Sequence, residues 1–242
     1  MDADELLRRY ATGERDFTHI DLSAVNLREA NLVSVDLSGA NLSNSDLREA
    51  RLGQAKLFQA NLAGANLSET ILWGTDLSEA NLYQTELREA DLSGAKLIKA
   101  QLKETRLIKA FFCGANLSSA NLAKAILFEA DLRPSSDQQT DLGYANLSDA
   151  DLSYANLGGV MLQGANLNGA KLCRAILEVR GIDKSYQTNL SRANLRGADL
   201  SYANLDGVNL EQADLLGADI TRAVLSNANL KGAIMPDGSI HE

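Results

Sequence analysis

The chain has 242 residues, a formal net charge of −9 and only 5% aromatic residues. The negative charge argues against a nucleic-acid-binding protein, because neutralising phosphates requires a basic face. Cys113 and Cys173 are too few for a disulfide framework or a thiolate metal site, and they suit a reducing compartment. No apolar stretch approaches the ~20 residues that span a bilayer, and the acidic N-terminus is unlike a signal peptide. We therefore expect a soluble, cytoplasmic protein with no membrane partner.

The first 13 residues are expected to form a short amphipathic helix. Asp2 and Glu5 have the spacing of a capping box, and Gly13 can end the helix. A repeat protein has two open ends that must be covered. We therefore expect residues 1–13 to cap the repeat region, which occupies residues 14–235.

The repeat region has a period of five. Leucine recurs at every fifth position from 22 to 132 except at Phe112, from 142 to 177, and from 190 to 230 except at Ile220. A small residue, usually Ala, lies two positions before each leucine, and Asn or Asp commonly lies one position before it. The unit is A-(D/N)-L-x-x, and so regular a unit predicts a solenoid.

A five-residue period suits neither a helix, around which it would drift, nor a continuous strand, on which it would alternate between faces. It suits a short extended side followed by a turn, with the small residue and the leucine both facing inward. Four sides make a coil of about 20 residues, and the coils stack at ~4.8 Å into an all-β rod roughly 50 Å long. A bulky residue at a small position, as in Ala80→Phe, is then expected to overpack the interior.

Two segments interrupt the repeat. Residues 133–140 place Asp137 where a leucine belongs, and the ten-residue gap between the flanking leucines keeps the fivefold register. Residues 178–189 lie in a gap of 13, which adds three residues to the register and predicts an outward loop. Counting 20 residues per coil puts both interruptions on one side, two coils or about 10 Å apart. They are either tolerated irregularities or recognition loops on one contact surface. Residues 236–242 form a short tail.

Outward-facing residues form columns when the sequence is folded at 20 residues per coil. An acidic column lies beside a partly basic one, which predicts either a solvated face or an electrostatic docking strip. The acidic column contains Glu29, Glu49, Glu69, Glu89, Lys109, Glu129 and Asp149. The basic column contains Arg28, Arg48, Ser68, Arg88, Ile108 and Phe128.

One side of the predicted rod carries exposed apolar residues, among them the single tryptophan. Such a cluster resembles the core of an interface, although scattered exposed apolar residues are also ordinary. Together with the interruptions, it gives a hypothetical partner-binding set. The set contains Ile71, Trp73, Phe111, Cys113, Arg133, Asp137, Gln138, Arg180, Asp183, Lys184 and Tyr186.

The sequence lacks a catalytic constellation. His19 and His241 are the only histidines and lie near opposite ends, so a triad or a two-histidine metal site is implausible. Glycines occupy the turn positions of the repeat and form no phosphate loop. We expect a non-enzymatic protein with no cofactor, no metal and no small-molecule substrate.

The A-(D/N)-L-x-x unit resembles that of the pentapeptide-repeat family. The resemblance implies a right-handed quadrilateral parallel β-helix. Four stretches also resemble a cyanobacterial subgroup that regulates heterocyst differentiation, namely residues 5–10, 132–136, 171–175 and 235–241, and the two interruptions and the tail make this resemblance specific. That resemblance implies a positive regulator whose partner is HetR or another protein of the HetR–PatS system, with no direct nucleic-acid contact and a monomer favoured.

Two other functions remain open. The chain also resembles, more loosely, the family members that mimic DNA and bind DNA gyrase. The net charge of −9 over a rod of roughly 50 Å is far below the charge density of DNA, and basic residues interrupt the acidic column. The third possibility is a structural spacer.

Overall fold

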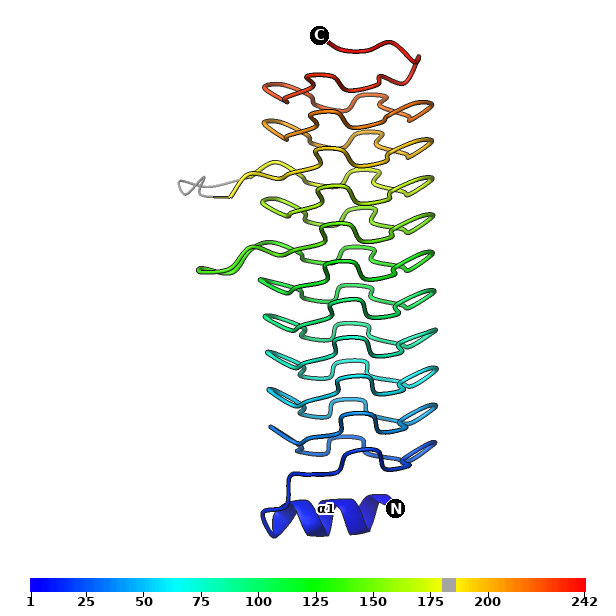
Figure 1. Ribbon diagram of the computed structural model, residues 1–242, viewed down its shortest axis with the longest axis vertical. Helices are drawn as coiled ribbons and strands as arrows, with labels where there is room; N and C mark the ends of the chain where they lie inside the picture. The colour runs from blue at the N-terminus through cyan, green and yellow to red at the C-terminus, as the bar shows by residue number, and fades with distance from the viewer. Residues whose placement is uncertain (180–185) are drawn as a thin grey trace.

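The computed structural model describes residues 1–179 and 186–242 as a tall stack of coils with one helix at its N-terminal end (Figure 1). The helix is α1, Ala3–Ala11. The described coils contain no continuous strand; single parallel bridges join each coil to the next, as between Asp16 and Asp36 or Asn26 and Asp46. Bridges recur every five residues and usually pair residues 20 apart, so a regular coil has four bridges and four turns.

The turns explain why Asn or Asp precedes leucine. In the unit 26–30, the Ala30 amide donates to the Leu27 carbonyl at 3.1 Å, which closes a four-residue turn. The Asn26 side chain accepts a hydrogen bond from the Arg28 amide at 3.1 Å and so holds the turn from outside. Glu29, the third residue of the turn, has a φ of 59°, a left-handed conformation that most residues adopt at a cost. Cooperative stacking of the coils must offset that cost.

Leucine amides connect the coils while leucine side chains fill the interior. Leu82, for example, has no exposed surface, and its amide donates to the Gln101 carbonyl of the next coil at 2.8 Å. The small residues are equally buried, and where one is threonine its hydroxyl finds a carbonyl inside the stack. Thr75 and Thr85 donate to the carbonyls of Leu52 and Leu62 at 2.7 and 2.9 Å. These buried hydroxyl groups therefore form hydrogen bonds within the protein and need no water.

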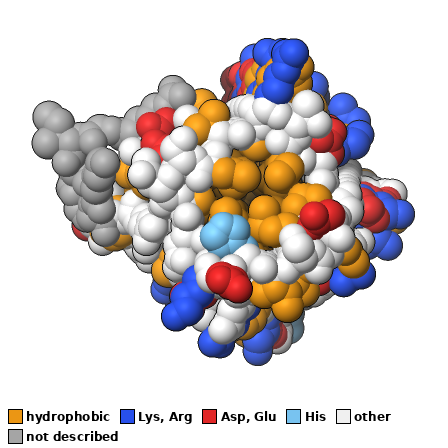
Figure 2. Space-filling view, turned by 90° about the horizontal axis from the view of Figure 1, so that it is seen from above, with side chains coloured by type: hydrophobic (Ala, Val, Ile, Leu, Met, Phe, Trp, Pro, Cys, Tyr) orange, Lys and Arg blue, Asp and Glu red, His pale blue; other side chains and the backbone are white. Residues whose placement is uncertain are grey.

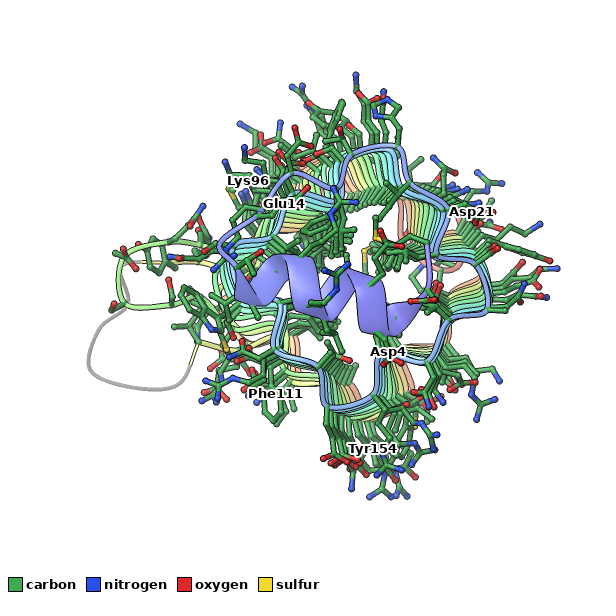
Figure 3. The ribbon with its side chains drawn as sticks, turned by 90° about the horizontal axis from the view of Figure 1, so that it is seen from below. Asp4, Glu14, Asp21, Lys96, Phe111 and Tyr154 are labelled. Atoms are coloured by element: carbon green, nitrogen blue, oxygen red, sulfur yellow. The ribbon has the colours of Figure 1, made fainter. Side chains whose placement is uncertain are left out.

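Helix α1 lies across the N-terminal opening of the stack (Figure 3), as the sequence predicts. Its N-cap Asp2 accepts from the Glu5 amide at 2.9 Å. Leu6 is fully buried against the first coils, and the Tyr10 hydroxyl donates to the Val33 carbonyl at 2.8 Å. These contacts fix the helix on the apolar end of the stack.

The C-terminal end is covered less completely. Leu225 and Leu230 are only partly buried, and apolar side chains are visible at the centre of this end (Figure 2). The tail turns back through an antiparallel bridge between Ile234 and Ile240, which covers one side of the last coil.

Both interruptions lengthen their coils, and this corrects the expected register. Asn121 stacks on Asn146, 25 residues on, so the first interruption inserts five residues as a loop in which Asp137 is exposed instead of occupying a leucine position. Asn166 stacks on Asn194, 28 residues on, so the second inserts eight residues and not three. Inward positions cannot hold extra residues, and in the first interruption the inserted residues leave the stack at a turn.

The longer coils also change the outer columns. Ile126 bridges Asp151, which places Glu129 against Tyr154. Asp149 instead stacks on Lys124. The acidic column therefore does not continue from Glu129 to Asp149 as expected.

An added bulky side chain should be tolerated on the outside of the stack but not in its interior. Ala80 is fully buried and Glu79, its neighbour in the turn, points outward. We predict that Ala80→Phe lowers the free energy of unfolding by about 1–3 kcal/mol or more. Glu79→Phe, with the same added ring, should change it by less than about 0.5 kcal/mol. Chemical denaturation followed by circular dichroism compares the two, and equal effects would contradict an interior filled by leucine and alanine.

Candidate interaction surface

The two loops leave the stack at the same turn column, one after Leu132 and one after Leu177. The intervening coil contributes the turn at Gly158 and Gly159, which lies between them. The described parts of both interruptions therefore lie on one side of the stack, as expected (Figure 1). Arg180, Asp183 and Lys184, three of the hypothetical partner-binding residues, lie outside the described residues.

The glycine pair allows the loops to approach each other. A Cβ atom on Gly158 would lie 2.5 Å from the Glu178 carbonyl oxygen, a distance that real structures exclude. A Cβ atom on Gly159, whose φ is +83°, would lie 3.1 Å from the Pro134 ring and 3.3 Å from the Tyr186 Cβ. Pro134 and Tyr186 thus both lie close to Gly159, which brings the described parts of the two loops to the same turn.

Hydrogen bonds join the loops to each other through Gln139. Its Nε2 atom donates to the Gly159 carbonyl at 2.7 Å and is 3.3 Å from the Gln187 carbonyl. Ser135 closes the tip of the first loop, where its amide donates to the Gln138 carbonyl at 2.8 Å and its hydroxyl to Asp137 at 3.0 Å. Asp137 and Gln138 are therefore presented outward at the tip.

A buried threonine closes the base of each loop. Thr140 Oγ1 accepts from the Gly114 amide at 2.9 Å and is 2.9 Å from the Arg133 carbonyl. Thr188 Oγ1 accepts from the Gly159 amide at 2.7 Å and donates to the Leu177 carbonyl at 2.5 Å. Thr188 takes the place of a backbone acceptor for the Gly159 amide, whereas the Gly114 amide shares its hydrogen bond between Thr140 and the Arg133 carbonyl, 3.3 Å away.

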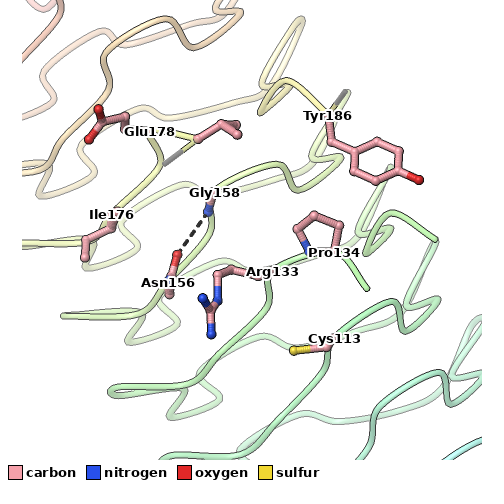
Figure 4. Close-up of a pocket in the computed structure, with 9 residues that line it drawn as sticks. Cys113, Arg133, Pro134, Asn156, Gly158, Ile176, Glu178 and Tyr186 are labelled. Carbon is pink, nitrogen blue, oxygen red and sulfur yellow. Dashed lines mark hydrogen bonds between the residues drawn. The ribbon is translucent and has the colours of Figure 1, made fainter. Parts of the chain in front are cut away.

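A groove of about 600 Å³ lies between the loops and the side of the stack (Figure 4). Apolar and charged side chains both reach it, which is typical of a surface that binds a protein segment. Its lining contains Cys113, Arg133, Pro134, Asn156, Gly158, Ile176, Glu178, Val179 and Tyr186.

Among the described residues, Arg133 and Asp131 form an ion pair at the groove. Arg133 Nη2 lies 2.7 Å from Asp131 Oδ2, and Nε lies 3.0 Å from Oδ1. Burial raises the pKa of Asp131, but the hydrogen bonds and charge of Arg133 outweigh burial and hold that pKa below its ordinary value. Burial, followed by the charge of Asp131, raises the pKa of the Cys113 thiol. Cys113 is therefore a protonated lining residue and a poor nucleophile at neutral pH.

A second, shallower hollow of about 380 Å³ continues toward the N-terminus, where Phe111 and Ile71 lie two bridges apart. Trp73 is 42% exposed, and its indole covers Gly53, where a Cβ atom would lie 2.6 Å from Nε1. Of the hypothetical partner-binding residues, Cys113, Arg133 and Tyr186 meet in the groove. Ile71 and Phe111 share the hollow, and Trp73 stands apart from both.

Sequence reasoning missed the residues that build the groove, namely Pro134, Gln139, Thr140, Gly158, Gly159 and Thr188. A signal for some of them exists: Gly158–Gly159 fills both turn positions with glycine, and a threonine takes the small position at the end of each interruption. The described residues contain no group of three or more side chains suited to a metal ion, and none of their helices is long and apolar enough to cross a membrane.

We predict that Thr188→Val destabilises the protein by about 1–3 kcal/mol, because the buried Gly159 amide and Leu177 carbonyl lose their partner. The amide of Gly159 should also exchange faster with solvent. Thr75→Val is the matched control, since the Leu52 carbonyl keeps its bond from the Ala55 amide at 3.0 Å. Equal unfolding free energies for the two variants would show that Thr188 does not hold the loop.

The comparisons agree with this architecture. The pentapeptide-repeat family model matches in eight copies over residues 16–54, 55–94, 95–133, 140–178, 186–212 and 198–235. The crystal structure of HetL from the cyanobacterium Nostoc sp. strain PCC 7120, a pentapeptide-repeat protein involved in heterocyst differentiation regulation, is 57% identical. That match covers 100% of both chains with a TM-score of 0.82.

Other solved structures are much less similar. Full-length QnrB1, a plasmid-mediated fluoroquinolone resistance protein, is 14% identical over 87% of this chain and 91% of its own, with a TM-score of 0.32. A pentapeptide-repeat protein from the thylakoid lumen of Arabidopsis thaliana is 29% identical over 44% of this chain and 63% of its own, with a TM-score of 0.26. No curated protein sequence matches. The repeats and the full-length likeness to HetL show that this chain belongs to the pentapeptide-repeat family and has its β-helical fold.

Proposed function

We propose that the chain is a cytoplasmic, non-enzymatic interaction module, a right-handed quadrilateral β-helix that promotes heterocyst differentiation by binding a protein of the HetR–PatS system. The full-length likeness to HetL carries this proposal. Because the match covers both chains completely, it includes the two loops and the tail, which the plain repeat does not specify.

The groove between the loops is the surface that best suits a protein partner. The stack holds it in place, its lining includes Tyr186, Pro134 and Ile176, and Arg133 supplies an exposed guanidinium. Large apolar anchors next to charged groups are the usual composition of an interaction hot spot.

The gyrase-binding alternative requires a surface that imitates the regular charge of duplex DNA. The described surface mixes charges instead: Arg28 pairs with Glu49 at 2.5 Å, and Lys109 lies 3.5 Å from Glu129. We therefore do not favour a DNA mimic. The likeness to QnrB1 is too low to support one. Inhibition of gyrase supercoiling by the purified protein would reverse this preference.

We predict that purified HetR binds the protein and that Tyr186→Ala or Arg133→Glu weakens binding by about tenfold or more, as expected for the loss of a hot-spot anchor. Isothermal titration calorimetry with and without a PatS peptide measures the effect. Tyr144→Ala is the matched control, because Tyr144 is 67% exposed on a different turn column. A protein that binds no member of the HetR–PatS system would refute the proposed function. Binding that is equally strong in all variants would move the site away from the groove.

A further inference from the structure

A different turn column, which we call the ridge, changes character halfway along the stack. Its N-terminal half is acidic and contains Glu29, Glu49, Glu69 and Glu89. Its centre contains Lys109 and Glu129. Its C-terminal half contains Tyr154, Arg174, Tyr202 and Arg222, which only the lengthened coils bring into line with the acidic half. All ten side chains are exposed. Figure 3 shows Tyr154 on a turn column away from the loops.

The C-terminal half is a ladder of alternating aromatic and cationic groups. The Arg174 guanidinium lies 5.8 Å from the Tyr154 ring centre and 5.2 Å from that of Tyr202. Arg222 lies 5.4 Å from the Tyr202 ring and donates to its hydroxyl at 3.2 Å. In the described part of the chain neither arginine forms an ion pair with a carboxylate, unlike Arg28, which pairs with Glu49. The ladder therefore presents two preorganised guanidinium groups that can still bind an anion.

Within the described residues, part of the acidic half lacks cationic partners. Glutamates on successive coils lie about 4.8 Å apart by the coil spacing, so they repel one another. Arg28 is close to Glu29 and Glu49, at 3.4 and 2.5 Å, but within the described residues Glu69 and Glu89 have no cation in ion-pair range. Cations from outside the chain would relieve this repulsion.

The order of the two halves makes the ridge complementary to itself. Consider a second copy that lies alongside in the opposite direction, with a twofold axis between the coils of Lys109 and Glu129. Each coil on one side of the axis then faces the coil of the second copy that is equally far beyond the axis. Arg222 then faces Glu29, and Arg174 faces Glu69. Tyr202 and Tyr154 face Glu49 and Glu89, to which their hydroxyls can donate. From this we infer that the ridge mediates an antiparallel, side-by-side dimer of this chain.

The residues nearest the twofold axis fit the same arrangement. Lys109 of each copy would face Glu129 of the other, which extends the 3.5 Å pair already formed within each chain. In the adjacent column, Ile108 and Phe128 lie on consecutive coils and are half-buried. A twofold axis perpendicular to the stack keeps equivalent columns opposite each other, so Ile108 faces Phe128 of the second copy. An apolar centre with charged flanks is the usual layout of an interface.

A second copy explains the ridge better than a nucleic acid does. Arg174 and Arg222 lie against the ring of Tyr202, and Phe128 lies 5.5 Å from Tyr154, so these rings are less open to base stacking. Nine coil steps give a ridge of roughly 43 Å. Because it is only two side chains wide, its contact belongs with the small interfaces below about 1,200 Å² and should be weak. The monomer expected from the sequence is then the dilute form of the protein.

Charge reversal tests the dimer. Sedimentation equilibrium from about 10 µM to about 1 mM protein should show dimerisation that weakens between ~20 mM and ~500 mM salt. Arg174→Glu or Glu69→Arg alone puts two like-charge pairs in the twofold interface and should raise the dissociation constant about tenfold. The double variant Glu69→Arg/Arg174→Glu restores both pairs and should restore dimerisation. Glu79→Arg and Arg192→Glu, on another turn column, are the controls and should have no effect.

A cysteine pair tests the orientation. Ser68 and Cys173 lie next to Glu69 and Arg174, so the arrangement puts Ser68 of one copy opposite Cys173 of the other. In a Cys113→Ser background, Ser68→Cys should form a disulfide-linked dimer with Cys173 under mild oxidation, whereas Ser78→Cys, on another turn column, should not. A protein that stays monomeric up to about 1 mM, a double variant that does not regain dimerisation, or equal cross-linking of both cysteine variants would each overturn the inference.

Discussion

The structure depends on one repeated interaction: a leucine amide bonds to a carbonyl of the next coil while the leucine side chain fills the interior beside a small residue. In the unit of Leu82, the amide reaches the Gln101 carbonyl at 2.8 Å and the side chain has no exposed surface. Because both requirements must hold at every fifth residue, the coil cannot absorb additional residues. Variation in size and charge between coils is therefore found mainly at the outward positions and in the loops.

That constraint explains how the groove arises. Five and eight inserted residues lengthen two coils at one turn column, and the buried hydroxyls of Thr140 and Thr188 accept hydrogen bonds from backbone amides at the base of each loop. Glycines at 158 and 159 remove the side chains that would hold the loops apart. The same insertions shift the later residues around the coil and bring Tyr154 onto the column of Glu129. Loop length thus determines both the groove and the composition of the ridge.

The period of five was sufficient to predict the coils and the inward leucines, because both follow from local spacing and side-chain size. The N-terminal helix was predicted separately, from its capping residues. The same spacing could not give the lengths of the interrupted coils. Asp137 was assigned to an inward position because ten is a multiple of five, whereas a charged residue there would have been buried without a partner. That error also linked Glu129 to Asp149. Arg133 and Tyr186, which belong to the two interruptions, were expected on one surface, whereas Cys113 was grouped with Trp73 and not with the loops. The approach of Pro134 and Tyr186 to Gly159 depends on two coil lengths at once.

Hydrogen exchange of the leucine amides is the most direct measurement of the central claim. Amides up to Leu215, which donates to the Ile234 carbonyl at 2.8 Å, should be strongly protected. Those of Leu225 and Leu230 have no acceptor in the described residues and should exchange rapidly. Protection that ends abruptly at the last complete coil is the expected result. Rapid exchange at leucines in the middle of the stack, such as Leu82 or Leu132, would contradict a chain held together by bonds between coils.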